Sequence, residues 1–413
     1  MNSNWEKPIE ISLAFRNIIR QKQRSLISLG AIIFGVCSLI LASGFIEWIF
    51  IDFRETSIRS QLGHLQITHP GYQEEGKANP YHFLLPDIQP ELKRTSSSLE
   101  KIKIIVPRLS FSGLISSGES TLSFIGEGVD PNEQNFFGDA LQLTTGNYLS
   151  GNNTFQIIMG EGLSRNLGVE TGDNVTLLVN TASGGINAIE VTISGLFTTV
   201  TKSYDDNAIR IPIETAQKLI RVTGVHSWIV LLNHTEDTNQ VLSLLHDQLP
   251  QSKFEITPWY QLADFYNKTI VLFSKQVLAI KIIIAAIILL SISNTMSISV
   301  MERTGEIGTA MALGIKQSII LRMFLMEGIL LGCIGGILGV MIGYLLANII
   351  SSVGIPMPPP PGMARGYTGE ILVTQSMVLE AISLAIGTTL IASVYPAWKA
   401  SKLQIVDALR HNR

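Results

Sequence analysis

Four long apolar segments constrain this chain more than any other feature of its sequence. They cover residues 26–51, 277–300, 328–353 and 376–396. About 20 apolar residues cross the hydrocarbon layer of a bilayer as a helix. Because open strands and loops leave backbone groups without hydrogen bonds in lipid, we expect an α-helical membrane protein with four transmembrane helices.

The composition agrees with this class and excludes others. Charged residues make up 15% of the 413 residues and hydrophobic residues 46%, whereas soluble domains carry about a quarter charged residues. The net charge of −3 argues against a nucleic-acid partner. Cys37 and Cys333 both lie in apolar segments, so we expect no disulfide in the polar part. The first apolar segment is too long for a signal-peptide core, so no cleavable signal is expected.

The distribution of lysine and arginine predicts the orientation. These residues gather in segments 1–25, 301–327 and 397–413, whereas segment 354–370 contains only Arg365. Short cytoplasmic segments carry such an excess of positive charge. We therefore expect both termini in the cytoplasm and the long polar stretch 52–273 on the opposite side of the membrane.

The first 25 residues have the pattern of an amphipathic helix. Pro8 suits a first helical position, and Leu13, Phe15, Ile18 and Ile19 supply apolar surface against the basic residues of the segment. Such a helix lies along the inner membrane surface. A plain positively charged flank explains the charges but not the apolar spacing.

Two features within the spans have more than one interpretation. Lys281 and Glu380 either form an intramembrane site or extend to the outer interface, and the second interpretation is favoured. Small residues in the third span would let another helix approach closely, either from the same chain or from a second copy. The glycines that we expect to serve helix packing are Gly332, Gly335, Gly336, Gly339 and Gly343.

The polar stretch 52–273 is long enough to form its own core. Short alternating runs at 121–125, 174–179, 188–193 and 208–212 predict strands, and SGGI at 183–186 predicts a hairpin turn. Segments 213–222 and 238–248 have helical periodicity. The expected fold is a mixed α/β domain with a β-rich middle.

Residues 258–300 read as one helix that projects beyond the membrane. Thr257 is a candidate cap, Pro258 suits the first turn, and the apolar spacing continues into the second span. Such a helix would measure about 64 Å, roughly twice the hydrocarbon thickness. It would act as a stalk that carries motion into the outer domain.

A search for catalytic or metal-binding motifs finds none that is convincing. Residues 71–78 read GYQEEGKA, close to a phosphate-binding loop, but Ala78 replaces the required hydroxyl, and Glu74 and Glu75 would repel phosphate. The histidines are scattered and form no zinc-binding pair. Asp205 and Asp206 are interpreted as a solvated turn. We therefore expect no catalytic site, metal or cofactor on this chain.

Three cytoplasmic motifs resemble those of a known permease family. Segment 300–314 reads VMERTGEIGTAMALG and is followed by FLMEG at 324–328. The tail reads YPAWKASKL at 395–403 and ALR at 408–410, and the start reads AFRNIIR at 14–20. In this order the motifs resemble the MacB/FtsX superfamily of ABC transporter permeases. GEGLSRNLGVETGD at 160–173 resembles a region of this family's periplasmic domain. Residues 191–197, followed by SYD at 203–205, are similar to the lipoprotein-releasing LolC/LolE branch.

The resemblance implies the architecture and the partners. It implies a periplasmic α/β domain at 52–273, with a porter-like part and a β-rich insert, on a bacterial inner-membrane protein. It also implies a separate cytoplasmic ATPase dimer that holds ATP and magnesium, and a second permease copy or relative. The substrate would be a lipoprotein or lipid, and a periplasmic partner protein is possible. Residues expected to couple the chain to the ATPase are Glu302, Arg303, Glu306, Ile307 and Gly314.

The coupling segment also has a helical pattern of its own. Thr304 is a candidate cap, Glu306 suits the positive N-terminal end of a helix, and Gly314 suits its C-terminal end. These signals predict a helix of about ten residues at the membrane surface. The alternative is an ordinary loop whose charges only set topology.

The loop 354–370 contains four consecutive prolines, Pro358, Pro359, Pro360 and Pro361. They predict a stiff polyproline II segment that serves either transport or merely as a spacer. Two functional alternatives to lipoprotein or lipid release also stay open. One is MacB-like efflux of drugs or peptides, and the other is FtsX-like signalling to cell-wall hydrolases.

Overall fold

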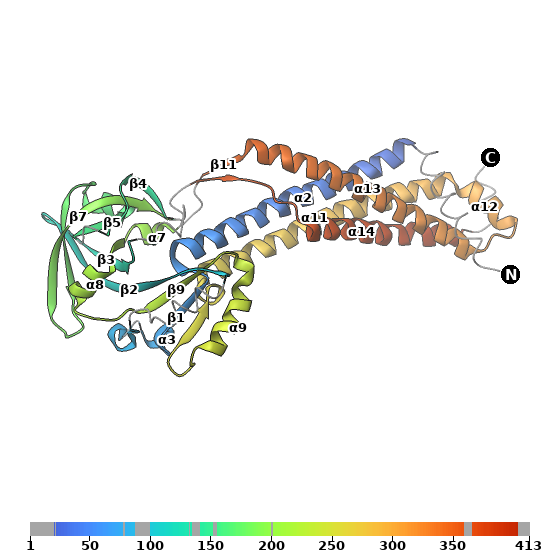
Figure 1. Ribbon diagram of the computed structural model, residues 1–413. Coiled ribbons are helices and arrows are strands. Elements are labelled where there is room, and N and C mark those ends of the chain that lie inside the picture. The colour runs from blue at the N-terminus through green and yellow to red at the C-terminus, as the bar shows by residue number, and fades with distance from the viewer. Residues whose placement is uncertain are drawn as a thin grey trace. The chain divides into compact units, whose positions relative to one another are not determined.

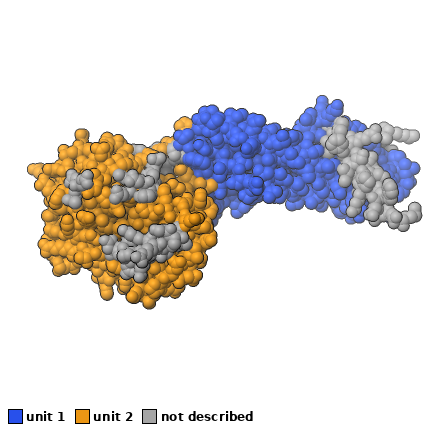
Figure 2. All heavy atoms as spheres, in the orientation of Figure 1, with its two compact units in different colours: residues 1–50, 270–355, 368–413 blue, residues 51–269, 356–367 orange. Residues whose placement is uncertain are grey.

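The computed structural model describes residues 20, 22–76, 79–86, 100–131, 133, 141–151, 155–199, 201–358 and 366–403. The expected amphipathic helix at 1–25 therefore lies almost entirely outside the described residues, as do Lys77, Ala78 and prolines 359–361. The chain divides into two compact units, coloured separately in Figure 2. We call residues 1–50, 270–355 and 368–413 the helical unit, and residues 51–269 and 356–367 the α/β domain.

The helical unit contains four helices that are long and apolar enough to cross a membrane (Figure 1). They are α2 (Lys22–Ser57), α11 (Asp264–Glu302), α13 (Gln317–Val353) and α14 (Gln375–Ser401). Their most apolar windows have mean hydropathies between 1.9 and 2.4. The side chain of Thr374 caps α14 by accepting a hydrogen bond from the Met377 N–H.

The expectation of one continuous helix from Pro258 is wrong in its first turns. Pro258 ends strand β10 (Glu255–Pro258), and Thr257 pairs with Gln66 of β1 (Leu65–Thr68) instead of capping a helix. A separate turn, α10 (Trp259–Leu262), precedes α11, and the backbone leaves the helical region at Ala263, with ψ of 59°. Strand pairing therefore overrides the local cap signal. Helix α11 alone measures about 58 Å at 1.5 Å per residue.

The α/β domain is built on one highly branched sheet of ten strands (Figure 1). The strand order is β10-β1-β9-β2-β3-β8-β5-β7-β4, and β6 pairs with both β2 and β7. The remaining strands are β2 (Ile102–Ser117), β3 (Ser120–Val129), β4 (Gln142–Gly146), β5 (Gln156–Gly160), β6 (Asn174–Asn180), β7 (Ile186–Thr198), β8 (Ala208–Pro212) and β9 (Ser227–Leu232).

Strand β2 runs through two hydrophobic cores because it is 16 residues long. Its first half pairs with β9 beside a core around Trp228, which α9 (Thr238–Gln248) covers. Its second half pairs with β3 and β6 beside a core around Phe124. Two helices, α6 (Glu161–Leu167) and α8 (Ile213–Ile220), contribute to this second core.

The strands and helices expected in the centre of this domain are confirmed. The four predicted runs lie in β3, β6, β7 and β8, and the two predicted helices are α8 and α9. The SGGI hairpin turn is also confirmed, because the Thr181 N–H donates to the Gly185 carbonyl at 2.7 Å between β6 and β7. Gly184 has φ of 84°, a conformation that glycine adopts without strain.

Short elements complete the chain. They are η1 (Ile58–Leu62, one π-helical turn), α3 (Tyr72–Glu75), η2 (Pro80–Phe83), α7 (Lys202–Asp205), η4 (Thr235–Asp237), α12 (Thr304–Ala312), β11 (Ile355–Met357) and β12 (Tyr367–Gly369). Strands β11 and β12 pair with each other.

Two buried histidines in the α/β domain are held in the neutral form. His64 accepts the Leu232 N–H at Nδ1, 3.0 Å away, so its Nε2 donates to Thr235 Oγ1, also 3.0 Å away. His226 accepts the Ser110 N–H at Nδ1 and donates from Nε2 to the Pro80 carbonyl, both at 3.1 Å. Burial lowers the pKa of each histidine to about 4.

These two histidines make stability depend on pH in a defined window. In the unfolded chain a histidine has a pKa near 6.5, so the unfolded state binds more protons than the folded state between pH 6.5 and 4. Stability is therefore complete above about pH 6.5 and falls as the pH approaches 4, by at most about 3 kcal/mol per histidine. Thermal unfolding of the full-length protein in detergent should show this decline.

Matched variants assign the decline to these side chains. His64→Asn and His226→Asn should each flatten the pH dependence of Tm between pH 6.5 and 4, even where Tm at neutral pH is lower. His234→Asn should leave the dependence unchanged, because His234 is exposed. An equal slope in all three variants and the wild type would contradict the assignment.

Candidate functional site

Helix α12 forms a short amphipathic connection between α11 and α13 (Figure 1). Ile307, Gly308 and Met311 are buried, and Ile307 and Met311 belong to the same hydrophobic cluster as Phe324 of α13. Glu306 lies exposed in the first turn. The helix is thus anchored on one face and open to solvent on the other.

The ends of α12 differ in part from the expectation. Thr304 is not its cap, because the Thr304 hydroxyl donates to the carbonyls of Val300 and Met301 in the last turn of α11, and Arg303 occupies the capping position. Gly314 follows the helix with φ of 92°, which lets the Ile315 N–H donate to the Ala310 carbonyl. Such a bond closes a helix C-terminus behind a glycine.

Ion pairs connect the start of α2 to the region of α12. Arg20 donates to Glu306 at 2.7 Å, and Arg24 pairs with Glu302. The Arg20–Glu306 side chains are 57% and 60% exposed, so this pair adds at most about 1 kcal/mol. The carboxylate of Glu306 therefore remains accessible to a partner.

A third ion pair is buried at the junction of α11 and α12. Arg303 and Glu327 lie 3.5 Å apart with side chains 4% and 5% exposed. Arg303 Nε and Nη2 have no hydrogen-bond partner among the described residues. Arg303 therefore does not face solvent, and its pairing with Glu327 of α13 fixes the start of α12. Removal of either member would leave an uncompensated buried charge.

The glycines of α13 lie on two faces, each against another helix of the same chain. A Cβ at Gly335, Gly339 or Gly343 would meet α2, with Val36 Cβ at 2.7 Å from position 339. A Cβ at Gly332 or Gly336 would meet α14. The close approach of three helices thus depends on the absence of side chains along α13.

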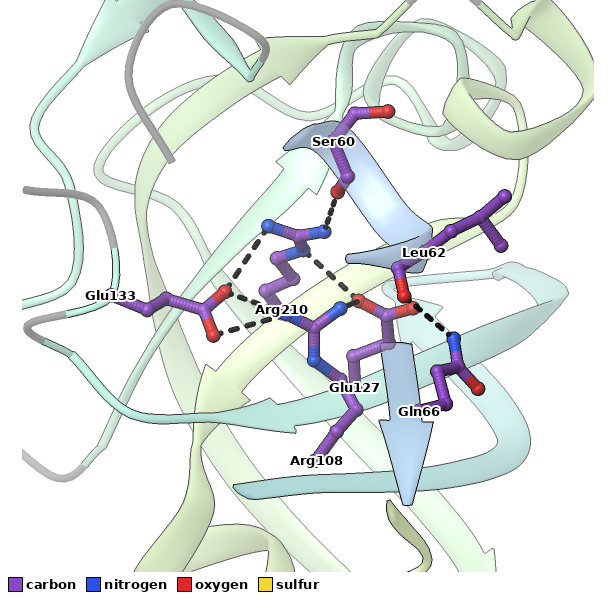
Figure 3. Close-up of polar contacts among 7 residues, drawn as sticks. All are labelled: Ser60, Leu62, Gln66, Arg108, Glu127, Glu133 and Arg210. Carbon is purple, nitrogen blue, oxygen red and sulfur yellow. Dashed lines mark hydrogen bonds and ion pairs between the residues drawn. The ribbon is translucent and has the colours of Figure 1, made fainter. Parts of the chain in front are cut away.

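Four charged side chains, of which three are buried and Glu127 is 14% exposed, form a cluster in the α/β domain (Figure 3). Arg108 of β2 contacts Glu127 of β3 at 3.1 Å and Glu133 at 3.0 Å. Arg210 of β8 contacts the same two carboxylates at 3.1 and 3.4 Å. The Nη2 of Arg210 also donates to the Ser60 carbonyl at 2.7 Å.

This cluster connects the end of α2 to the middle of the sheet. Ser60 belongs to η1, which continues directly from α2. Burial raises the pKa of Glu127, but the guanidinium groups of Arg108 and Arg210 outweigh it and hold the pKa below its usual value. Burial, and then the Glu127 charge, raise the pKa of Tyr204, which keeps this phenol neutral. The cluster therefore contains two matched pairs of opposite charge.

A second polar connection reaches the same segment of α2. The Thr235 hydroxyl accepts from His64 Nε2 and donates to Glu55 at 2.7 Å. Arg54 also contacts Glu236, at 3.5 Å. The end of α2 is therefore fixed to the domain both at β8 and at η4.

Sequence reasoning missed these buried contacts, although a signal was present. Arg210 interrupts the otherwise apolar strand AIRIP, and Arg108 follows the apolar run IIVP, which is unusual for a charge without a partner. Asp205 was also misjudged, since it is not solvated: it is 2% exposed and accepts hydrogen bonds from the Thr199 N–H and hydroxyl. Its short side chain completes a tight turn.

The GYQEEGKA segment does not form a phosphate-binding loop in its described part. Residues 72–75 form the helical turn α3, and the N–H groups of Glu74 and Glu75 donate to the Gly71 carbonyl. These N–H groups are therefore not available to an anion. Among the described residues, no group of histidine, cysteine, aspartate and glutamate side chains could hold a metal ion.

Two family models match the chain and together cover both units. A model described as MacB-like periplasmic core domain matches residues 25–248, and a model described as FtsX-like permease C-terminal matches residues 278–405. Four membrane-spanning helices with an α/β domain between the first two define a membrane permease. The chain belongs to the MacB/FtsX family of ABC transporter permeases.

Two relatives that match over more than half of the chain are each 27% identical to it. An uncharacterized ABC transporter permease of Methanocaldococcus jannaschii is 27% identical over 64% of this chain and 64% of its own length. The lipoprotein-releasing system transmembrane protein LolC of Xylella fastidiosa is 27% identical over 62% of this chain and 65% of its own. The match thus spans less than two thirds of either relative.

Two further comparisons concern MacB proteins. The macrolide export ATP-binding/permease protein MacB of Syntrophobacter fumaroxidans is 26% identical over 46% of this chain and 26% of its own length. The crystal structure of the periplasmic region of MacB from Actinobacillus actinomycetemcomitans covers 52% of this chain and 95% of that chain, at 16% identity and a TM-score of 0.35.

The packing of α13 generates a prediction with a matched control. Gly339→Ala should destabilise the protein by about 1–3 kcal/mol, because the new methyl group would lie 2.7 Å from Val36 Cβ and 3.1 Å from the Ile33 carbonyl. Gly387→Ala in α14 should be neutral or slightly stabilising, since nothing lies within 4 Å of its Cβ position. Thermal unfolding in detergent compares the two, and equal Tm changes would contradict the packing account.

Proposed function

We propose that this permease couples ATP hydrolysis on a separate cytoplasmic ATPase dimer to movements of its α/β domain in the periplasm. The observation that supports this most is α12, a short helix buried on one face and open on the other. Exposed Met301 and Leu313, 63% and 81% exposed, flank the accessible carboxylates Glu302 and Glu306. A surface of this kind suits a groove in a partner protein.

The mechanism follows from the length of the helices and from the fixed end of α2. Helix α2 begins in the helical unit and ends in the α/β domain, as the residue bounds of α2 and of the two units require. Thr235 holds Glu55 in its last turns, and Arg210 holds Ser60 in η1, which follows α2 directly. A displacement at α12 would pass along the helices to the domain, without a polar channel for substrate.

The orientation in the bacterial inner membrane is part of the same proposal. The excess of lysine and arginine in these segments supports a cytoplasmic location of both termini and of α12, where ATP is available. Two copies of the permease, or this chain with a relative, would bind one ATPase dimer. A periplasmic partner protein could associate with the α/β domain.

The proposed substrate is a lipoprotein or lipid taken from the outer leaflet of the inner membrane. The match to LolC, named as part of a lipoprotein-releasing system, supports this class. MacB-like efflux of drugs or peptides is the second candidate, since the MacB-like core model covers much of the chain. Purification of the permease from native membranes, followed by mass spectrometry of the proteins and lipids that remain bound, distinguishes the two.

A charge reversal tests the role of α12. Glu306→Arg should insert into the membrane normally, because added positive charge agrees with a cytoplasmic location. ATPase copurification should fall by about tenfold or more, since contacts to a charged group contribute about 1.5–3 kcal/mol. Glu119→Arg, at an exposed turn of the α/β domain, is the matched control and should copurify like the wild type.

A charge swap separates docking from the internal ion pair. Arg20→Glu combined with Glu306→Arg restores the internal pair with reversed charges but not the docking carboxylate. We expect the double variant to copurify with the ATPase as poorly as Glu306→Arg alone. Full recovery of ATPase binding in the swap, or wild-type binding by Glu306→Arg alone, would contradict a docking role for Glu306.

A further inference from the structure

A cavity in the helical unit is lined by three charged side chains. Its volume is about 420 Å³, and its lining includes Glu47 of α2, Lys281 of α11 and Glu380 of α14. About 32 Å of helix separates Lys281 from Glu302, and a similar length separates Glu380 from Ser401. That distance matches one hydrocarbon thickness, so the charges lie at the membrane boundary opposite α12.

The charges of this cavity do not balance. Lys281 Nζ pairs with Glu380, and their side chains are 21% and 52% exposed. Glu47 has no ion-pair partner among the described residues, although it is half-buried within an apolar helix. A half-buried carboxylate without an ion-pair partner is available to bind a cationic group. The lining therefore carries one excess negative charge.

The walls of the cavity are amphipathic. Phe50, Val277 and Met377 provide apolar surface beside the charged groups. The hydroxyl of Ser43, which also lines the cavity, is buried and has no hydrogen-bond partner among the described residues. Ligand sites combine apolar walls with a few polar groups and have volumes of about 300–1,000 Å³.

We propose that this cavity binds the protonated amine head of an amphiphile, with Glu47 as the counter-ion. The ammonium donates to Glu47 and to the Ser43 hydroxyl, while the adjoining alkyl chain lies against Phe50 and Met377. Lys281 stays paired with Glu380 and excludes a second cation. The assignment rests on the proposed function, because it identifies the head-group chemistry of what the permease takes from the membrane.

Native mass spectrometry of the full-length protein in detergent tests the site with two probes of equal chain length. Dodecylamine should bind at least about tenfold more tightly than dodecanol, as expected for a hydrogen bond to a charged group. Glu47→Gln should abolish this preference. Glu370→Gln should retain it, because Glu370 is an exposed carboxylate that does not line the cavity.

A second variant keeps the test decisive if Glu47→Gln folds poorly. Met377→Trp fills the cavity and leaves all three charges in place, so it should also abolish the preference for dodecylamine. Persistent preference for the amine in either well-folded variant would overturn the site, as would equal binding of both probes by the wild type.

Phospholipid probes distinguish two sources of the amine. If phosphatidylethanolamine binds more tightly than phosphatidylglycerol and loses this advantage in Glu47→Gln, the amine comes from a membrane lipid. If only dodecylamine depends on Glu47, the amine comes from a single-chain amphiphile. Both results support the site. The measurement needs neither ATPase nor nucleotide, so a negative result overturns the cavity assignment and leaves the role of Glu306 untouched.

Discussion

The hydrogen bond from Arg210 to the Ser60 carbonyl is the interaction on which the rest of this architecture depends. It connects η1, the π-helical turn that follows α2, to strand β8. The charged cluster around this bond also joins β2 to β3. Buried charges are retained only when each has its partner, and removal of one member typically costs about 3–5 kcal/mol. The segment that follows α2 is therefore fixed to the sheet within the α/β domain.

Within the helical unit, close packing performs a similar task. The glycines of α13 allow α2 and α14 to approach its backbone, and Arg303 and Glu327 hold the start of α12 against α13. Packed interfaces of this kind move between discrete arrangements and do not deform continuously. Under the proposed function, a displacement at the exposed face of α12 would move this packed group of helices together.

The sequence predicted those features that local patterns determine. The four spans, the strands such as Ala208–Pro212 and the SGGI turn depend on periodicity and turn chemistry over a few residues. It did not predict the break before Asp264, because pairing of Thr257 with Gln66 depends on a strand almost 200 residues away. The partners of Arg210 were missed for the same reason, because Ser60, Glu127 and Glu133 come from segments that are distant from Arg210 in the sequence.

The most direct test of the central claim is whether the end of α2 and the sheet move as one body. Spin labels at Arg59→Cys in η1 and Glu190→Cys in β7 would report the distance within one labelled copy, diluted with unlabelled permease and bound to its ATPase. Pulsed electron spin resonance should give the same distance distribution with and without a non-hydrolysable ATP analogue. A nucleotide-dependent change in this distance would place a flexible joint at η1 and contradict the account.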